Sequence, residues 1–102
     1  MHDDARRLAG RLERRLLDGP AVSSQAERTA AFHGTAEGPL GDYERQVEQA
    51  AFRVTAEQVE ALRGHHADDA LFELTLCAAH GAARRRLDAG LRALDEAFGD
   101  QP

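Results

Sequence analysis

The sequence has little of what marks many functional classes. It contains one cysteine, so no disulfide can form within the chain, and a reducing cytosol is compatible with it. It contains no lysine, because all thirteen basic residues are arginine, which points to a GC-rich coding sequence rather than to a mechanism. No apolar run is long enough to span a bilayer, and the first twenty residues lack the apolar segment of a signal peptide. These absences predict a cytoplasmic protein with no membrane partner.

Large core residues are also scarce. The chain has twelve leucines, four valines and four phenylalanines, but no isoleucine and no tryptophan, and much of its 42% hydrophobic content is alanine. A chain of 102 residues forms one small domain and buries a limited share of its surface, so its own core would be thin. The formal charge of −5 argues against a nucleic-acid partner, which needs a basic face.

Helix signals follow one another along the chain, and no segment alternates like a strand. Residues 1–22 predict an N-terminal helix, capped by Asp3 or Asp4, with its turn. A short second helix begins after Ser24, where Glu27 completes a capping box. The apolar positions of the first helix have helical spacing and predict a buried face: Ala5, Leu8, Leu12 and Leu16.

The core helices are predicted within 40–98. The third helix covers about 40–53, and the fourth begins at Thr55, where Gln58 forms a second capping box. Asp68 or Asp69 caps the fifth. We therefore expect one all-α domain of about five helices over 1–102.

The segment from Ala67 to Phe98 is the most informative. It has no proline, and as one helix it would be roughly 45 Å long. A compact domain of this size has a radius of gyration near 13 Å. Such a helix overhangs its own domain, bends or packs against another chain, which predicts a homo-oligomer. Two apolar stripes are expected on it, and both are expected to be buried: Phe72, Leu76, His80, Ala83, Leu87, Leu91, Leu94 and Phe98 in the first, and Leu71, Leu74, Ala78 and Ala82 in the second.

One group of chemically active residues shares a face of this helix. Glu73, Cys77, His80 and Arg84 fall within about 60° of one another. The imidazole and the guanidinium would lower the pKa of the thiol, and the carboxylate would orient it or accept a proton. The alternative is a buried structural cysteine with ordinary neighbours, because free cysteine is among the most buried residue types.

Two further groups have structural alternatives that we favour. His65 and His66 with Asp68 and Asp69 could supply metal ligands, but adjacent histidines point in different directions, so we expect no metal site. The arginines at 84, 85 and 86 could bind an anion, but a solvated face or salt bridges explain them as well, with Asp88 one turn beyond Arg84.

The segment 53–91 resembles the C-terminal half of the alkylhydroperoxidase D-like, or carboxymuconolactone decarboxylase, family. The similarity lies in a helix opening with Thr-Xaa-Glu-Xaa-Val, an acidic turn, and a long helix of Phe-Glu-Leu type rich in small residues. These residues carry it: Thr55, Glu57, Val59, Ala61, Leu62, Arg63, Phe72, Glu73 and Leu74. The resemblance implies an all-α oligomer, often a trimer or hexamer built through the long helices. Peroxidase members use a Cys-Xaa-Xaa-Cys pair, which a chain with one cysteine lacks, so no catalytic residue carries over.

The sequence therefore predicts a noncatalytic homo-oligomer or small-molecule binding module without a cofactor. The first alternative is an enzyme: a decarboxylase of the family type, or a one-cysteine reductase using Cys77 and His80. The second is a helix-turn-helix-like regulator built from the fourth and fifth helices. The acidic balance and the apolar 71–83 segment argue against it.

Overall fold

The computed structural model describes residues 2–99, apart from the side chains of His2 and Ala5. Ala5 of the predicted first face and the ends of the predicted domain 1–102 therefore lie outside the described residues. The described residues hold no strand, and the predicted all-α class with a long last helix is confirmed. Their elements are α1 (His2–Asp18), α2 (Gln25–His33), α3 (Gly38–Ala50), the short 3-10 helix η1 (Ala51–Arg53), α4 (Ala56–Arg63) and α5 (Asp68–Phe98).

Local capping explains where α2 and α4 begin. The Ser24 hydroxyl accepts a hydrogen bond from the Glu27 amide (3.1 Å), and the Glu27 carboxylate accepts one from the Ser24 amide (3.0 Å), which confirms the capping box. Gly34 ends α2 with a left-handed φ of 70°. The Thr55 hydroxyl accepts from the Gln58 amide (3.2 Å) at the start of α4.

The fifth helix begins at Asp68, as predicted, but the predicted caps of the first and fifth helices and the predicted bounds of the third are wrong. Ala67 precedes α5 without a side-chain cap, so Asp68 and Asp69 lie in the first turn, where their charge favours the helix dipole. Asp3 and Asp4 likewise lie inside the first turn of α1. The third helix begins at Gly38 and ends at Ala50, because the chain tightens into η1 before Val54.

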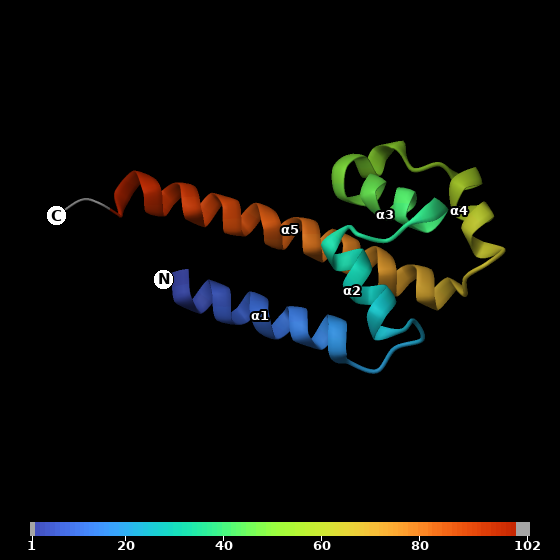
Figure 1. The fold of residues 1–102 in the computed structure, drawn as a ribbon, viewed down its shortest axis with the longest axis horizontal. Coiled ribbons are helices and arrows are strands. Elements are labelled where there is room, and N and C mark those ends of the chain that lie inside the picture. The colour runs from blue at the N-terminus through green and yellow to red at the C-terminus, as the bar shows by residue number, and fades with distance from the viewer. Residues whose placement is uncertain (1, 100–102) are drawn as a thin grey trace.

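The helices divide the molecule into a body and an arm. Figure 1 shows α2, α3 and α4 gathered around the first half of α5, while α1 runs antiparallel beside its second half. We call residues 6–18 and 84–98 the arm. The molecule measures 58 × 29 × 18 Å with a radius of gyration of 15.9 Å, above the roughly 13 Å of a compact domain of this length. The predicted overhang of the last helix is therefore present, and α1 lies along it.

The core lies in the body and is small. One buried cluster joins Ala31 of α2 to Leu74 and Cys77 of α5, with Leu16, Leu17 and Leu40 packed against it. A second joins Tyr43, Leu62 and Leu71, with apolar side chains of α3 and α4 around it. The short second helix, which the prediction left outside the core helices of 40–98, thus lies at the centre.

The two predicted stripes of α5 have different environments. Leu71, Leu74, Ala78 and Ala82 are buried, as predicted. Of the other stripe only Leu91 is buried, while Phe72 is 65% and Leu94 is 46% exposed. Leu8 and Leu12 of α1 are also about half exposed (53% and 48%). The prediction that these positions are buried is wrong for the isolated chain, because α2 and α3 cover one side of α5 only.

Within residues 2–99, no helix combines the length and apolar character that crossing a membrane requires.

Candidate functional site

Helical spacing places Glu73, Cys77, His80 and Arg84 on neighbouring turns of α5, but their partners differ. The Glu73 carboxylate holds the linker between α1 and α2. It accepts hydrogen bonds from the amides of Val22 (2.9 Å) and Ser23 (2.7 Å) and from the Ser23 hydroxyl (2.7 Å). These bonds, led by that from the Ser23 amide, lower the pKa of Glu73. Its two oxygens are thus used in fixing the linker.

Cys77 is fully buried against Ala31 and Leu74. Loss of hydration raises the pKa of the thiol to about 11, and the nearby Arg28 guanidinium offsets this only in part. The predicted lowering of this pKa by His80 and Arg84 is therefore wrong. A neutral thiol without solvent access lacks the thiolate character of a reactive cysteine.

His80 and Arg84 also have separate environments. The His80 ring lies 6.0 Å from the Phe32 ring, centroid to centroid, and its Nε2 atom is buried without a hydrogen-bond partner. Arg84 pairs with Asp88 one turn along the helix (3.4 Å), as the spacing predicted. The four side chains do not converge on a common point at which a substrate could react.

The neighbouring arginines join helices. Arg85 forms an ion pair with Glu48 of α3 and donates a hydrogen bond to the Phe32 carbonyl of α2 (2.7 Å). Arg86 donates to the Glu48 carbonyl (2.6 Å). These contacts support the structural interpretation of the basic cluster, since two of its three guanidinium groups bind other helices.

The histidine pair before α5 does not form a ligand cluster with its acidic neighbours. Asp68 instead pairs with Arg63 at 2.9 Å and 3.2 Å. Across residues 2–99, no three His, Cys, Asp or Glu side chains lie close enough together to hold a metal ion.

Sequence reasoning missed a buried carboxyl on α3. Glu44 is 1% exposed, and neither of its oxygens has a hydrogen-bond partner. Burial raises its pKa to about 7, opposed by the charge of Arg45. A signal was available, because Glu44 falls on the same helical face as three predicted inward positions: Leu40, Tyr43 and Val47.

A buried arginine was missed as well. Arg28 of α2 is 4% exposed and donates hydrogen bonds to the carbonyls of Leu17 (2.7 and 3.1 Å), Ser23 (2.5 Å) and Gly19 (3.2 Å). It therefore fixes the end of α1 from inside, while Glu73 fixes the linker from α5. The sequence carries no motif that would reveal these carbonyl partners.

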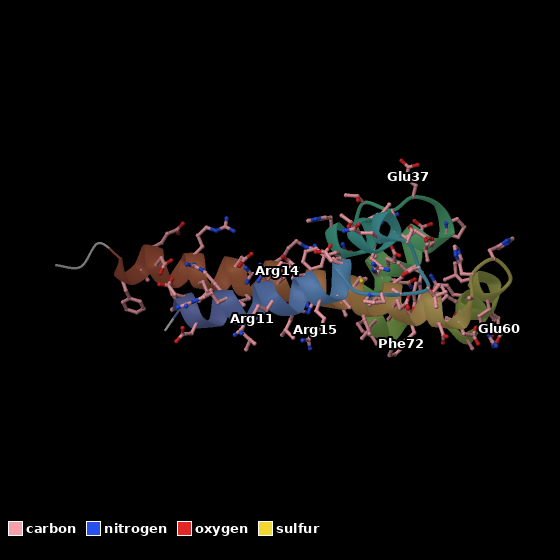
Figure 2. The ribbon with its side chains drawn as sticks, turned by 90° about the horizontal axis from the view of Figure 1, so that it is seen from below. Arg11, Arg14, Arg15, Glu37, Glu60 and Phe72 are labelled. Atoms are coloured by element: carbon pink, nitrogen blue, oxygen red, sulfur yellow. The ribbon has the colours of Figure 1, made fainter. Side chains whose placement is uncertain are left out.

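An exposed apolar row along α5 has no role in the fold, and we call it the outer row. All of its members are exposed: Phe72, Leu76, Ala79, Ala83, Leu87, Gly90, Leu94 and Phe98. Its first part borders a groove of about 630 Å³ whose other wall includes Leu12 and Leu16 of α1. In Figure 2, Phe72 lies along the same lower edge of the molecule as Arg11 and Arg15 of α1. The outer row and the groove form one surface shared by α1 and α5.

The exposed side of α5 can be compared with the recognition helix that the helix-turn-helix-like regulator would require. A recognition helix presents polar side chains to the DNA groove, with basic residues at the phosphates. The first half of α5 instead buries Leu71 and Leu74 and exposes Phe72 and Leu76.

Comparison with family models, with curated proteins and with solved structures finds no match to this chain.

Proposed function

We propose that this chain is a noncatalytic subunit of a homo-oligomeric helical assembly. The observation that carries the proposal is the outer row, which leaves five large apolar side chains 37–66% exposed along one helix: Phe72, Leu76, Leu87, Leu94 and Phe98. A contiguous apolar surface of this kind on a small domain marks a contact site. Covering it would bury apolar area at roughly 25 cal/mol per Å², which the thin core of one copy does not supply.

The resemblance to the alkylhydroperoxidase D-like family supports the same proposal. Its residues lie mainly on α4 and on the first two turns of α5, beside the start of the outer row. In that family the long helices build the oligomer. The single buried cysteine also fits a cytoplasmic location.

An enzymatic function has less support. Cys77 is buried and protonated, and Glu73 is engaged by the linker, so a one-cysteine mechanism would lack both its nucleophile and its proton acceptor. A cysteine-free decarboxylase would need a convergent set of polar groups facing a cleft. Two of the polar groups that line the α1–α5 groove serve the fold instead, because Arg28 and Glu73 bind backbone groups, and His80 and Arg15 alone do not make up such a set.

Two phenylalanines allow a matched test of assembly. Phe72 belongs to the outer row (65% exposed), whereas Phe52 of η1 is more exposed (84%) but lies off it. Sedimentation equilibrium of the wild type from about 1 to 100 μM, the range in which ordinary dimers dissociate, is expected to show an oligomer. We expect Phe72→Ser to weaken association by roughly a hundredfold, as loss of an aromatic anchor does, and Phe52→Ser to leave it unchanged.

A monomeric wild type throughout that range would contradict the proposal. Equal effects of the two substitutions would also contradict it, because assembly would then not depend on the outer row. Circular dichroism of both variants serves as the folding control. Both replaced side chains are mainly exposed, so neither substitution removes a core contact.

Binding of a small apolar molecule is a second candidate, favoured by the groove between α1 and α5. Its volume of about 630 Å³ lies within the range of small-molecule sites. Native mass spectrometry of the purified protein tests it, and a co-purified mass that Leu12→Arg removes would support it. A ligand-free spectrum together with unchanged stability on adding aliphatic probes would count against it.

A further inference from the structure

The spacing of the outer row is symmetric about one residue. From Phe72 to Leu94 the steps along the chain are 4, 3, 4, 4, 3 and 4, so the row reads the same from either end, with Ala83 at its centre. It also repeats every 11 residues, since Phe72, Ala83 and Leu94 are equivalent positions. An 11-residue repeat has 3.67 residues per turn, close to the 3.6 of a straight helix. Two such helices can therefore remain in contact over a long distance without strong supercoiling.

Side-chain size distinguishes the two possible orientations of a pair. If two copies of α5 cross antiparallel at Ala83, positions equally distant from that residue face one another. Leu76 of each copy then faces Gly90 of the other, and Leu87 faces Ala79. A large side chain fills the space left by a small one in each of these layers, as close packing requires.

A parallel pair would place each residue opposite itself. Gly90 would then face Gly90 and leave a gap. Leu76 would face Leu76, so that two large side chains would meet only two layers away from the pair of small Ala83 side chains. Nothing lies within 4 Å of the Cβ position of Gly90 in the single chain, so that space is open to an incoming side chain. The aligned helix dipoles of a parallel pair would also repel at both ends.

We propose that a second copy of this chain packs on the outer row antiparallel, about a two-fold axis at Ala83. This proposal rests on the proposed function and adds to it the orientation and the register. The interface is isologous, so the same residues contribute from both copies. Leu12 of α1, which lines the groove beside Phe72 and Leu76, extends the contact on either side.

Charge at the start of α5 disfavours the parallel arrangement. The first turn of α5 carries Asp69 on the side of the outer row. A parallel pair would place Asp69 beside its own copy, which is unfavourable. The antiparallel register instead places it near the far end of the other α5, where Arg6 and Asp95 form an ion pair of opposite charges (3.6 Å).

Disulfide trapping tests orientation and register. Leu76→Cys and Gly90→Cys are prepared as separate proteins, mixed and oxidised. Because a disulfide needs Cβ atoms about 3.5–4.5 Å apart, the mixture is expected to give a Leu76→Cys/Gly90→Cys heterodimer roughly tenfold faster than either protein links to itself. Ala83→Cys alone is expected to link to its own copy. The buried Cys77 makes the wild type the control that forms no cross-link.

The outcomes separate the two proposals. Self-linking of Leu76→Cys as fast as the mixture would overturn the antiparallel orientation. An oligomer by sedimentation whose three variants all fail to cross-link would overturn this orientation and register but leave assembly through the outer row standing. A monomeric wild type would overturn both. Because Leu76 is exposed and the Cβ position of Gly90 meets no atoms within 4 Å, both variants are expected to keep the wild-type circular dichroism spectrum.

Discussion

Glu44 connects the core to solution pH through a single side chain. Its carboxyl lies in the body, where the charged or titratable groups facing it are Cys77 of α5, Glu27 of α2 and Arg45 of its own helix. Only Arg45 is positive, and it does not offset burial, so the pKa rises from 4.5 to about 7. A carboxyl that stays protonated near neutral pH is compatible with this core, whereas a carboxylate there would be a buried charge without a hydrogen-bond partner.

We expect stability to fall as the pH rises from 4.5 to about 7. In this window the folded chain holds a proton on Glu44 that the unfolded chain has released, so ionisation favours unfolding, and the effect levels off above pH 7. A shift of this size corresponds to about 3 kcal/mol. The side chain of Glu44→Gln stays neutral throughout. The free energy of unfolding, measured with urea, should therefore rise for the variant relative to the wild type by about that amount between pH 5 and pH 8. The lowered pKa values of Glu27 and Glu73 act in both proteins and cancel in this comparison. If the difference in free energy of unfolding between the variant and the wild type does not change with pH, the raised pKa of Glu44 is contradicted.

Among the elements, the contact of α2 with α5 determines the body. A Cβ atom at Gly81 would collide with the Phe32 carbonyl oxygen and would lie 2.7 Å from its carbon, so only glycine allows the two backbones to approach this closely. At the same place Arg85 donates a hydrogen bond to the Phe32 carbonyl. The close approach brings Ala31 onto Leu74 and Cys77.

Gly81→Ala is therefore expected to destabilise the fold, by about 1–3 kcal/mol, because one methyl group must push α2 from α5. The matched control is Gly10→Ala in α1, whose Cβ would meet only the Arg14 guanidinium, at 3.8 Å. Higher helix propensity is expected to make that variant up to about 1 kcal/mol more stable. Thermal unfolding of both measures the difference, and equal melting temperatures would show that the close approach is not needed.

The elements themselves could be predicted because their signals are local. The capping box of Ser24 and Glu27, the Thr55 cap and the uninterrupted helix formers of α5 act within a few residues of one another. The buried side of α5 could not be predicted in the same way. Both stripes are apolar and have helical spacing, so the choice depends on where α2 and α3 pack, which is a long-range property.

The candidate site was predicted less well for a similar reason. Spacing placed Glu73 and Cys77 on one face correctly, but it carried no information on the linker amides that occupy Glu73 or on the depth of Cys77. Glu44 was overlooked because a charged residue on an apolar face was not counted as an inward position. Its register with Leu40 and Val47 would have revealed it.

The whole molecule has an uneven distribution of stabilising contacts. The body holds the buried clusters, whereas the arm is two helices side by side with Leu91 as its buried leucine and with Leu8, Leu87 and Leu94 exposed. Two helices cannot enclose a core of their own, so the arm depends on whatever covers its apolar side. Stability of the folded chain and its association are then linked.

This linkage predicts a melting temperature that depends on protein concentration. Because the assembled form is the stabilised one, we expect the midpoint to rise by roughly 3 °C for each tenfold increase in concentration. Phe72→Ser, which removes an outer-row anchor, is expected to melt at a lower temperature than the wild type at each micromolar concentration, because its weaker association stabilises less of the protein. A wild-type midpoint that stays constant from low to high micromolar concentration would show that folding does not require association.

The arm also brings the two ends of the helical chain together. The start of α1 and the last turns of α5 lie at the same tip (Figure 1). Arg6 of α1 lies 3.6 Å from Asp95 of α5 there. A short engineered bridge between the start of α1 and the last turn of α5 would close the described helices into a ring without displacing any of them. Ring closure would remove much of the freedom that the unfolded chain gains between these helices, since the entropy of bringing distant segments together grows with the length of chain between them. The described helices are thus suited by their arrangement to a covalent link across the tip, and the exposed turn at Gly64–His65 is a place where the backbone could be opened in exchange.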